Sequence, residues 1–291
     1  MEGGKRRRNF RFRGGGRGGR GGRGGRRLRG GDGGNGHRGQ WLVVVGIRQR
    51  NDARIGFDGL ELDLGADYEE TLLWSAAGRR RLHDVIAASG LELASLCTGV
   101  CWTISPASDD PAIRGRIRDM LREATTHAAE FGVKWILVPV TPGEEGVSHA
   151  TGTQRWIDMM ADLAPHAADL GVVLCLENVG RGYGKSAAEL AHMVDTVQSP
   201  GLGVYYDVGN ALAFGNDPVA EIVFLGRRIA EVHIKERDAD LLGEGLVPIA
   251  DCLAALRTVG YNDWLVLETA PTGDPEAAAR HNLQYLRGLV G

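Results

Sequence analysis

Four residues that could bind a metal ion stand at or near the ends of apolar runs in the second half of the chain. Glu177 closes the run VVLCLE, Asp207 closes GVYYD and Glu268 closes WLVLE. His233 lies within EVHIK. Two glutamates, one aspartate and one histidine form an oxygen-rich ligand set, which suits Mn²⁺, Co²⁺, Mg²⁺ or Zn²⁺. Four such residues on four successive runs predict one site for a divalent metal ion.

The elements that must position these residues alternate along the chain, with short apolar runs between amphipathic stretches. This alternation is typical of βα units, which build a parallel sheet. Runs such as WILVPV and VVLCLE suit strands that are buried on both faces. We predict eight strands, at Trp41–Val45, Gly59–Leu64, Leu91–Cys97, Trp135–Val140, Val172–Glu177, Gly203–Asp207, Ile229–Lys235 and Trp264–Thr269.

Start and stop signals mark helices between these strands. Asp-Pro pairs at 110–111, 217–218 and 274–275 provide an N-cap carboxylate followed by proline in the first turn. Glycines at positions 90, 132, 171 and 260 precede the next strand, as helix-ending glycines do. Eight strands with their helices in about 250 residues predict an α/β fold, a (β/α)8 TIM barrel over residues 41–291. An open doubly wound sheet is the alternative, although no GxGxxG follows a strand.

In a barrel of this kind the C-terminal ends of the strands meet at one mouth, where catalytic groups collect. The four candidate ligands all lie near such ends, on the fifth to eighth predicted strands. Side chains alternate along a strand, so His233 and Lys235 should point the same way. We therefore expect the metal site at the mouth of the barrel, with Lys235 beside it.

The first βα unit is short. Only Gly46–Asp58 separates the first two predicted strands, and this leaves room for barely two helical turns. The unit is therefore either reduced or joined to a foreign N-terminus. An incomplete, poorly folded barrel is a further hypothesis.

Residues 1–40 differ sharply from the rest of the chain in composition. They contain 17 Gly and 13 Lys or Arg against two acidic residues, a net charge of +11, which leaves −14 on residues 41–291. So few apolar groups cannot offset chain entropy, and we expect a disordered RGG-rich tail. A flexible polycation can bind RNA through phosphate contacts and base stacking, so an RNA-binding protein acting through this tail is one hypothesis. An accessory or foreign segment is the favoured alternative, because the remainder contains no nucleic-acid motif.

The composition also argues against several other classes of protein. No apolar run approaches the roughly 18 residues of a membrane span, and no apolar stretch follows the basic start as in a secretory signal. The cysteines are few and form no CxxC pair, which indicates buried thiols in a reducing, cytoplasmic setting. They are Cys97, Cys101, Cys175 and Cys252.

The runs LCLENVGRG, GVYYDVGNA, EVHIKERD, LGEGLVP and WLVLET resemble the sugar-phosphate isomerase/epimerase superfamily, whose fold is the xylose-isomerase-like TIM barrel. The resemblance covers about residues 55–290, and the GEG turn at 243–245 is a further mark of it. As in the ketose 3-epimerases, it implies one divalent metal ion held by Glu177, Asp207, His233 and Glu268. It also implies that Glu177 and Glu268 move the protons.

Other residues resemble one branch of the superfamily. Asn210 stands where 3-epimerases of free ketoses often have histidine, and Lys235 follows His233 as in ketose-phosphate epimerases and hexulose-phosphate isomerases. Lys235 could neutralise negative charge or hold a substrate phosphate, while Asn178 and Asn210 could bind substrate hydroxyls. The trinuclear-zinc apurinic endonucleases need more histidines than this chain has at the corresponding positions.

The chemistry that follows is proton abstraction next to a carbonyl. A divalent cation stabilises the developing enediolate, and Glu177 and Glu268 can remove and return the proton. We therefore predict a metal-dependent epimerase or isomerase of a ketose or ketose phosphate. An inosose-type dehydratase on the same barrel is the alternative enzyme. The expected partner is the sugar substrate, and a homo-oligomer stays open.

The sequence also suggests places for the other ionisable residues. Glu61 and Asp63 end the second strand, and we expect one to face the mouth and the other to face the helices. His149 follows the fourth strand and could reach the site from a loop. The remaining body histidines fall in predicted helices and are expected to be structural or exposed: His83, His127, His166, His192 and His281.

Overall fold

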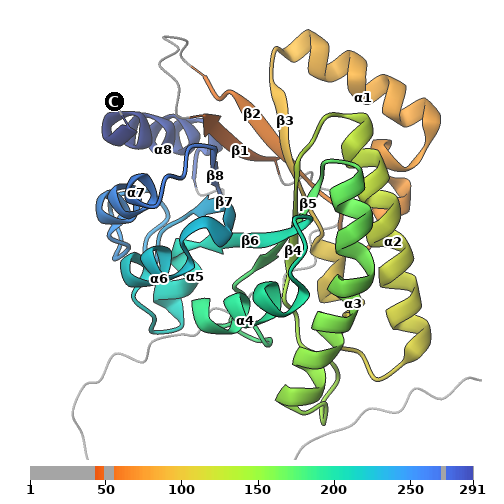
Figure 1. Cartoon of the computed structure of the whole chain (residues 1–291). Helices are drawn as coiled ribbons and strands as arrows, with labels where there is room; N and C mark the ends of the chain where they lie inside the picture. The colour runs from red at the N-terminus through yellow and green to blue at the C-terminus, as the bar shows by residue number, and fades with distance from the viewer. Residues whose placement is uncertain (1–42, 49–55, 270–272, 291) are drawn as a thin grey trace, which may run out of the picture. The chain divides into compact units, whose positions relative to one another are not determined.

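The computed structural model describes residues 43–48, 56–269 and 273–290 of the chain. Eight strands close into one ring in sequence order, with β8 next to β1, and the helices pack around it (Figure 1). The predicted (β/α)8 barrel is confirmed, while the closed ring contradicts the open sheet and does not support an incomplete barrel. The strands are β1 Val43–Arg48, β2 Gly59–Asp63, β3 Glu92–Cys97, β4 Trp135–Pro139, β5 Val173–Glu177, β6 Leu202–Asp207, β7 Ile229–Ile234 and β8 Trp264–Leu267.

Eight α-helices cover the outside of this ring in the described part of the chain. They are α1 Ala76–Ser89, α2 Pro111–Glu130, α3 His149–Asp169, α4 Ala187–Val197, α5 Val208–Ala213, α6 Pro218–Leu225, α7 Ile249–Thr258 and α8 Pro275–Val290. Short 3-10 helices lie at Tyr68–Glu70, Leu72–Trp74, Gly99–Trp102 and Gly226–Arg228. No described helix has the length and apolar content needed to cross a membrane.

The predicted helix signals are confirmed at both ends. Asp110 accepts a hydrogen bond from the backbone N–H of Ala112 at 2.8 Å, and proline opens the helix as expected. Asp217 caps α6 in the same way. At the other end of α1, Gly90 adopts the left-handed conformation, with φ of 71°, which lets the chain turn into β3.

The first strand departs from the prediction of a parallel sheet. Strands β2 to β8 are parallel to one another, but β1 pairs antiparallel with both β2 and β8. Residues 49–58 alone join β1 to β2, and a parallel crossover needs roughly a dozen or more residues. A connection this short allows antiparallel pairing instead. The strand also begins and ends later than the predicted Trp41–Val45.

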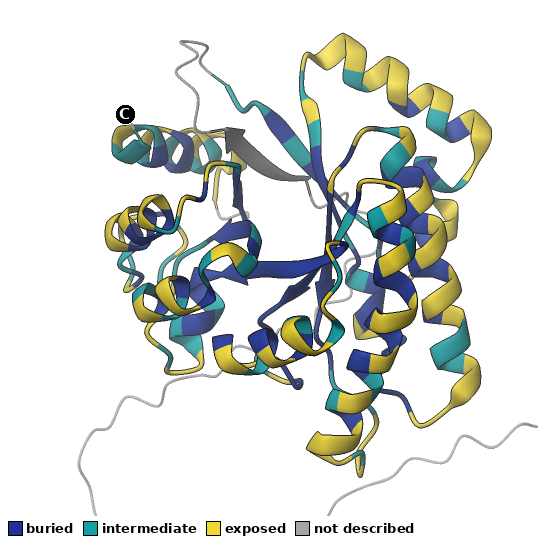
Figure 2. Ribbon diagram, viewed as in Figure 1, coloured by how far each residue is buried: buried dark blue, intermediate teal, exposed yellow. Residues whose placement is uncertain are grey.

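Two apolar clusters divide the core. The larger lies between the barrel and its helices, whose outer faces are exposed (Figure 2). The smaller fills the inside of the barrel and consists of Ala94, Trp135, Leu137, Cys175, Tyr205, Trp264 and Val266. On β7, Val232 and Ile234 face the helices, whereas Glu231 and His233 are buried on the opposite side. The inside of the barrel therefore mixes apolar with ionisable side chains.

The cysteines agree with the expected free thiols, whereas the tail lies outside the described residues. All four cysteines are free, and three of them are buried, while Cys97 is partly buried. The disorder and RNA-binding hypotheses for residues 1–40 fall outside the described residues and stay predictions.

Candidate metal centre

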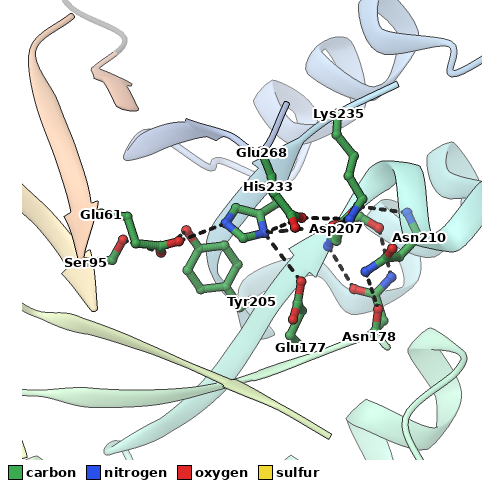
Figure 3. A network of polar contacts seen from close by, with 10 residues as sticks. All are labelled: Glu61, Ser95, Glu177, Asn178, Tyr205, Asp207, Asn210, His233, Lys235 and Glu268. Atoms are coloured by element: carbon green, nitrogen blue, oxygen red, sulfur yellow. Dashed lines mark hydrogen bonds and ion pairs between the residues drawn. The ribbon is translucent and has the colours of Figure 1, made fainter. Parts of the chain in front are cut away.

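The four predicted ligands converge at one end of the barrel. Glu177 and Asp207 are the last residues of β5 and β6, His233 is next to last in β7, and Glu268 directly follows β8. One ligand atom from each lies within 4.8 Å of the others (Figure 3). Three of the side chains are buried, whereas that of Glu268 is 35% exposed and marks the open side. We call Glu177, Asp207, His233 and Glu268 the ligand cluster.

The imidazole of His233 presents one ring nitrogen to the three carboxylates. Its Nδ1 lies 3.4 Å from Oε1 of Glu177, 3.4 Å from Oε2 of Glu268 and 3.8 Å from Oδ2 of Asp207. Within the described residues this buried nitrogen has no hydrogen-bond partner. A buried nitrogen that faces three carboxylates without a hydrogen bond to any of them is the arrangement that a divalent cation would satisfy. The residues present therefore fit a metal ion with oxygen and nitrogen ligands.

Lys235 lies beside this cluster, as the alternation along β7 predicts. Its Nζ is 2.7 Å from Oδ2 of Asp207 and 2.7 Å from Oε2 of Glu268. The side chain is 22% exposed, so Lys235 is less deeply buried than Asp207 and His233. This places a positive charge against two of the three carboxylates of the cluster.

The carboxyl groups of the cluster differ in their electrostatics. Burial raises the pKa of Glu177 to about 7, and burial likewise raises the pKa of Asp207. For Glu268, burial acts in the same direction, but the charges of Lys235 and His233 outweigh it and hold the pKa well below its usual range. Glu177 therefore holds a proton more readily than Glu268. A pair of carboxyls whose environments push their pKa values apart is typical of acid–base sites.

The two predicted asparagines join the ends of β5 and β6. Asn178 donates to the backbone oxygen of Asp207 at 2.8 Å, and its Oδ1 accepts from the Asp207 N–H at 2.8 Å. Asn210 donates to the backbone oxygen of Asn178 at 3.0 Å. These contacts position Asp207, and the substrate-binding roles of both asparagines stay predictions.

Glu61, one of the two acids named at the end of the second strand, contacts the cluster, although the sequence did not predict this contact. Oε1 of Glu61 lies 3.2 Å from Nε2 of His233, on the side of the ring opposite the carboxylates. The expectation that either Glu61 or Asp63 faces the helices is wrong, because Leu62 and Leu64 do so instead. Residues two apart on a strand share a face, so this alternation was the signal that could have placed both acids inside the barrel.

The remaining histidines lie away from the cluster. His149 begins α3, and its Nε2 pairs with Oε1 of Glu189 at 3.0 Å, with its side chain 60% exposed. None of its described contacts is with the ligand cluster. The five histidines assigned to helices all lie on helices, and His127 is buried against Trp74.

Comparisons with known proteins agree with the barrel fold. A family model described as "Xylose isomerase-like TIM barrel" matches residues 51–289. A putative L-ribulose-5-phosphate 3-epimerase of Escherichia coli K12 is 29% identical over 229 residues, which cover 73% of this chain and 79% of that protein.

Solved structures show the same fold. A D-psicose 3-epimerase determined in the presence of D-fructose superposes with a TM-score of 0.71 at 20% identity, over 81% of this chain and 90% of that one. A 3-keto-D-glucoside 4-epimerase from E. coli gives a TM-score of 0.70 at 20% identity, over 80% and 90%.

Proposed function

We propose a function from one premise: the chain belongs to the xylose isomerase-like TIM barrel family. On that premise, it is a divalent-metal-dependent epimerase or isomerase of a ketose or ketose phosphate. The observation that carries the proposal is the convergence of two glutamates, an aspartate and a histidine at the barrel mouth within 4.8 Å. The relative named as a 3-epimerase supports it, since carbon 3 of a 2-ketose lies next to the carbonyl and bears an acidic proton.

The ligand cluster would hold the metal ion through carboxylate oxygens and Nδ1 of His233. When bound, such an ion acts as a Lewis acid on the substrate carbonyl, which makes the neighbouring proton more acidic. Asp207 and His233 are deeply buried and serve as ligands. Glu177 and Glu268 reach the cluster from β5 and β8, two different sides of the ring.

The two glutamates are therefore the proposed acid–base pair. One removes the proton next to the carbonyl, and the other returns a proton. Return to the opposite face of the same carbon gives an epimer, whereas return to the neighbouring carbon gives an isomer. General acid–base groups of this kind each contribute about 10²–10⁴-fold to the rate.

Lys235 has an accessory role in this scheme. Its ammonium contacts two carboxylates of the cluster, and its side chain is partly exposed. A positive charge there can stabilise the negative charge that develops on the substrate oxygens. The same position would also suit a substrate phosphate, so a ketose and its phosphate should be compared as substrates.

The test is hydrogen exchange of the substrate in D₂O. Purified protein loaded with Mn²⁺ is incubated with a panel of ketoses and ketose phosphates, and deuterium next to the carbonyl is measured by NMR. We expect Glu177→Gln and Glu268→Gln each to slow exchange by about 10²–10⁴-fold. Glu276→Gln, on the exposed first turn of α8, is the matched control and should exchange at the wild-type rate.

The same experiment separates the alternatives. If neither glutamate variant slows exchange, the acid–base assignment is wrong. Loss of water from the substrate, detected as a new dehydrated product, would indicate the dehydratase instead.

A further inference from the structure

Inside the barrel, a buried carboxylate contacts the far edge of the His233 ring. Oε1 of Glu61 lies 3.2 Å from Nε2 of His233, and Glu61 is 1% exposed (Figure 3). Glu61 belongs to β2, which does not pair with β7, so this contact runs through the inside of the barrel. The two nitrogens of one imidazole thus face different partners, since Nδ1 faces the ligand cluster.

Two buried hydroxyl groups hold the Glu61 carboxylate in place. Ser95 donates to Oε2 at 2.6 Å, and Tyr205 donates to the same oxygen at 2.9 Å. The ring of Tyr205 also packs edge-on against His233, with 4.5 Å between the centroids. Because both hydroxyls use Oε2, the other oxygen is left to accept a hydrogen bond from His233.

We infer that Glu61 is a positioning residue, which keeps the ring proton of His233 on Nε2 and so leaves the lone pair of Nδ1 for the metal ion. The inference rests on the metal site of the proposed function. A carboxylate only accepts hydrogen bonds, and a neutral imidazole with its proton on Nε2 has its lone pair on Nδ1. That nitrogen is the one that faces Glu177 and Glu268.

The surroundings of Glu61 make this assignment specific. Within the described residues its carboxylate contacts two hydroxyl donors and one imidazole, all of them buried. A carboxylate partner fixes the ring orientation of a metal-binding histidine, and its loss costs about 10–100-fold in metal affinity. The same loss is expected here, because no other described side chain hydrogen-bonds Nε2 of His233.

Glu61→Gln tests the inference. The glutamine has one acceptor oxygen and cannot accept from His233 and from both hydroxyls at once. We expect the Mn²⁺ dissociation constant, measured by isothermal titration calorimetry, to rise by about 10–100-fold. In ¹⁵N-histidine NMR of Zn²⁺-loaded protein, we expect wild-type His233 to show a Zn²⁺-bound Nδ1 and a protonated Nε2. The signal of the Nε2 proton should shift in the variant, because its carboxylate acceptor is lost.

Glu231→Gln is the matched control. Glu231 is also a fully buried glutamate, on the same strand as His233, but its hydrogen bond is with Tyr261 at 3.1 Å. We expect this variant to bind Mn²⁺ as the wild type does. If Glu61→Gln does not fold, Tyr205→Phe replaces it, because the ring stays and only one donor to Glu61 is lost. That variant should weaken Mn²⁺ binding several-fold.

Three outcomes overturn the inference. Wild-type affinity in Glu61→Gln, or an equal loss in Glu231→Gln, contradicts the positioning role while the metal site stands. A wild-type protein that binds no divalent ion contradicts the proposed function itself, and the inference with it.

Discussion

Strands β5 to β8 each end in or next to a residue of the ligand cluster, whereas β2 and β3 supply residues that lie behind it. In the second half of the barrel, the carboxylates and the imidazole meet at the mouth. In the first half, Glu61 and Ser95 are buried inside the barrel, where Ser95 donates to Glu61 and Glu61 contacts the far edge of the His233 ring. One side of the ring provides the candidate chemistry, and the other side, together with Tyr205 of β6, orients it.

The position of a side chain along the barrel axis decides which of these two roles it takes. A carboxylate at the last position of a strand meets its counterparts on neighbouring strands, as the pairing of Asp207 with His233 shows. A carboxylate two residues from the end, such as Glu61, lies deeper and meets the backs of the ligands. Buried polar groups of this second kind are retained only where they have partners, and Glu61 has three.

The largest expected effect comes from removing a ligand in the second half. Asp207→Ala deletes a buried carboxylate that contacts His233 and Lys235 and is a proposed metal ligand. Lewis-acid catalysis supplies several kcal/mol, so we expect D₂O exchange to fall by about 10³-fold or more. In wild-type protein, Mn²⁺ at about 100 times its Kd should raise Tm by roughly 5–10 °C, and the variant should lose this shift.

The outcome for Asp207→Ala decides whether the second half is the chemical half. If the variant retains both the exchange rate and the Mn²⁺-dependent rise in Tm, the ligand cluster is not the metal site. Asp195→Ala, at an exposed ion pair with Arg228 on the outer surface, is the control and should keep both.

Much of this arrangement could be predicted from the sequence, because its signals are local. The apolar runs gave seven parallel strands close to their observed bounds, and the Asp-Pro caps gave helix starts. The ligand cluster was predictable because an acid or histidine at the end of an apolar run is conspicuous. The resemblance in LCLENVGRG and EVHIKERD then connected the four positions.

The rest depended on contacts between distant residues. The hydrogen bond between Glu61 and His233 joins positions 172 apart, and no local pattern reports it. The pairing of β1 with β8 likewise joins opposite ends of the barrel domain. The side of β2 on which Glu61 and Asp63 lie could have been predicted, because alternation along the strand already implied that they share a side.

A smaller effect is expected from two neighbours on β3 that face opposite sides. Leu96 is fully buried between the barrel and the helices, whereas Ser95 donates to Glu61 inside the barrel. We expect Leu96→Ala to lower the free energy of unfolding by about 2–5 kcal/mol without changing Mn²⁺ affinity. Ser95→Ala should cost only about 1 kcal/mol of stability but should weaken Mn²⁺ binding.

Urea unfolding and calorimetric titration of both variants measure this contrast. It sharpens the comparison by showing that position inside the barrel, rather than stability in general, governs metal binding. Equal losses of Mn²⁺ affinity in the two variants would contradict it, because Leu96 does not lie on the side of Glu61.

The smallest expected effect concerns a titratable residue of the first half that takes no part in the cluster. His127 on α2 is buried against Trp74 and Arg79, and burial together with the Arg79 charge lowers its pKa. A lowered pKa in the folded state means that the unfolded chain binds the proton first, so stability should fall as the pH drops below about 6.5.

Because about 1 kcal/mol moves Tm by only 2–4 °C in a domain of this size, we expect a difference of a few degrees at most. Between pH 8 and pH 5.5, the Tm of His127→Gln should fall less than that of wild type, while D₂O exchange at pH 7.5 stays the same. Parallel Tm profiles would show that His127 does not cause the loss of stability in acid, and slower exchange in the variant would show that the first half contributes to the chemistry directly.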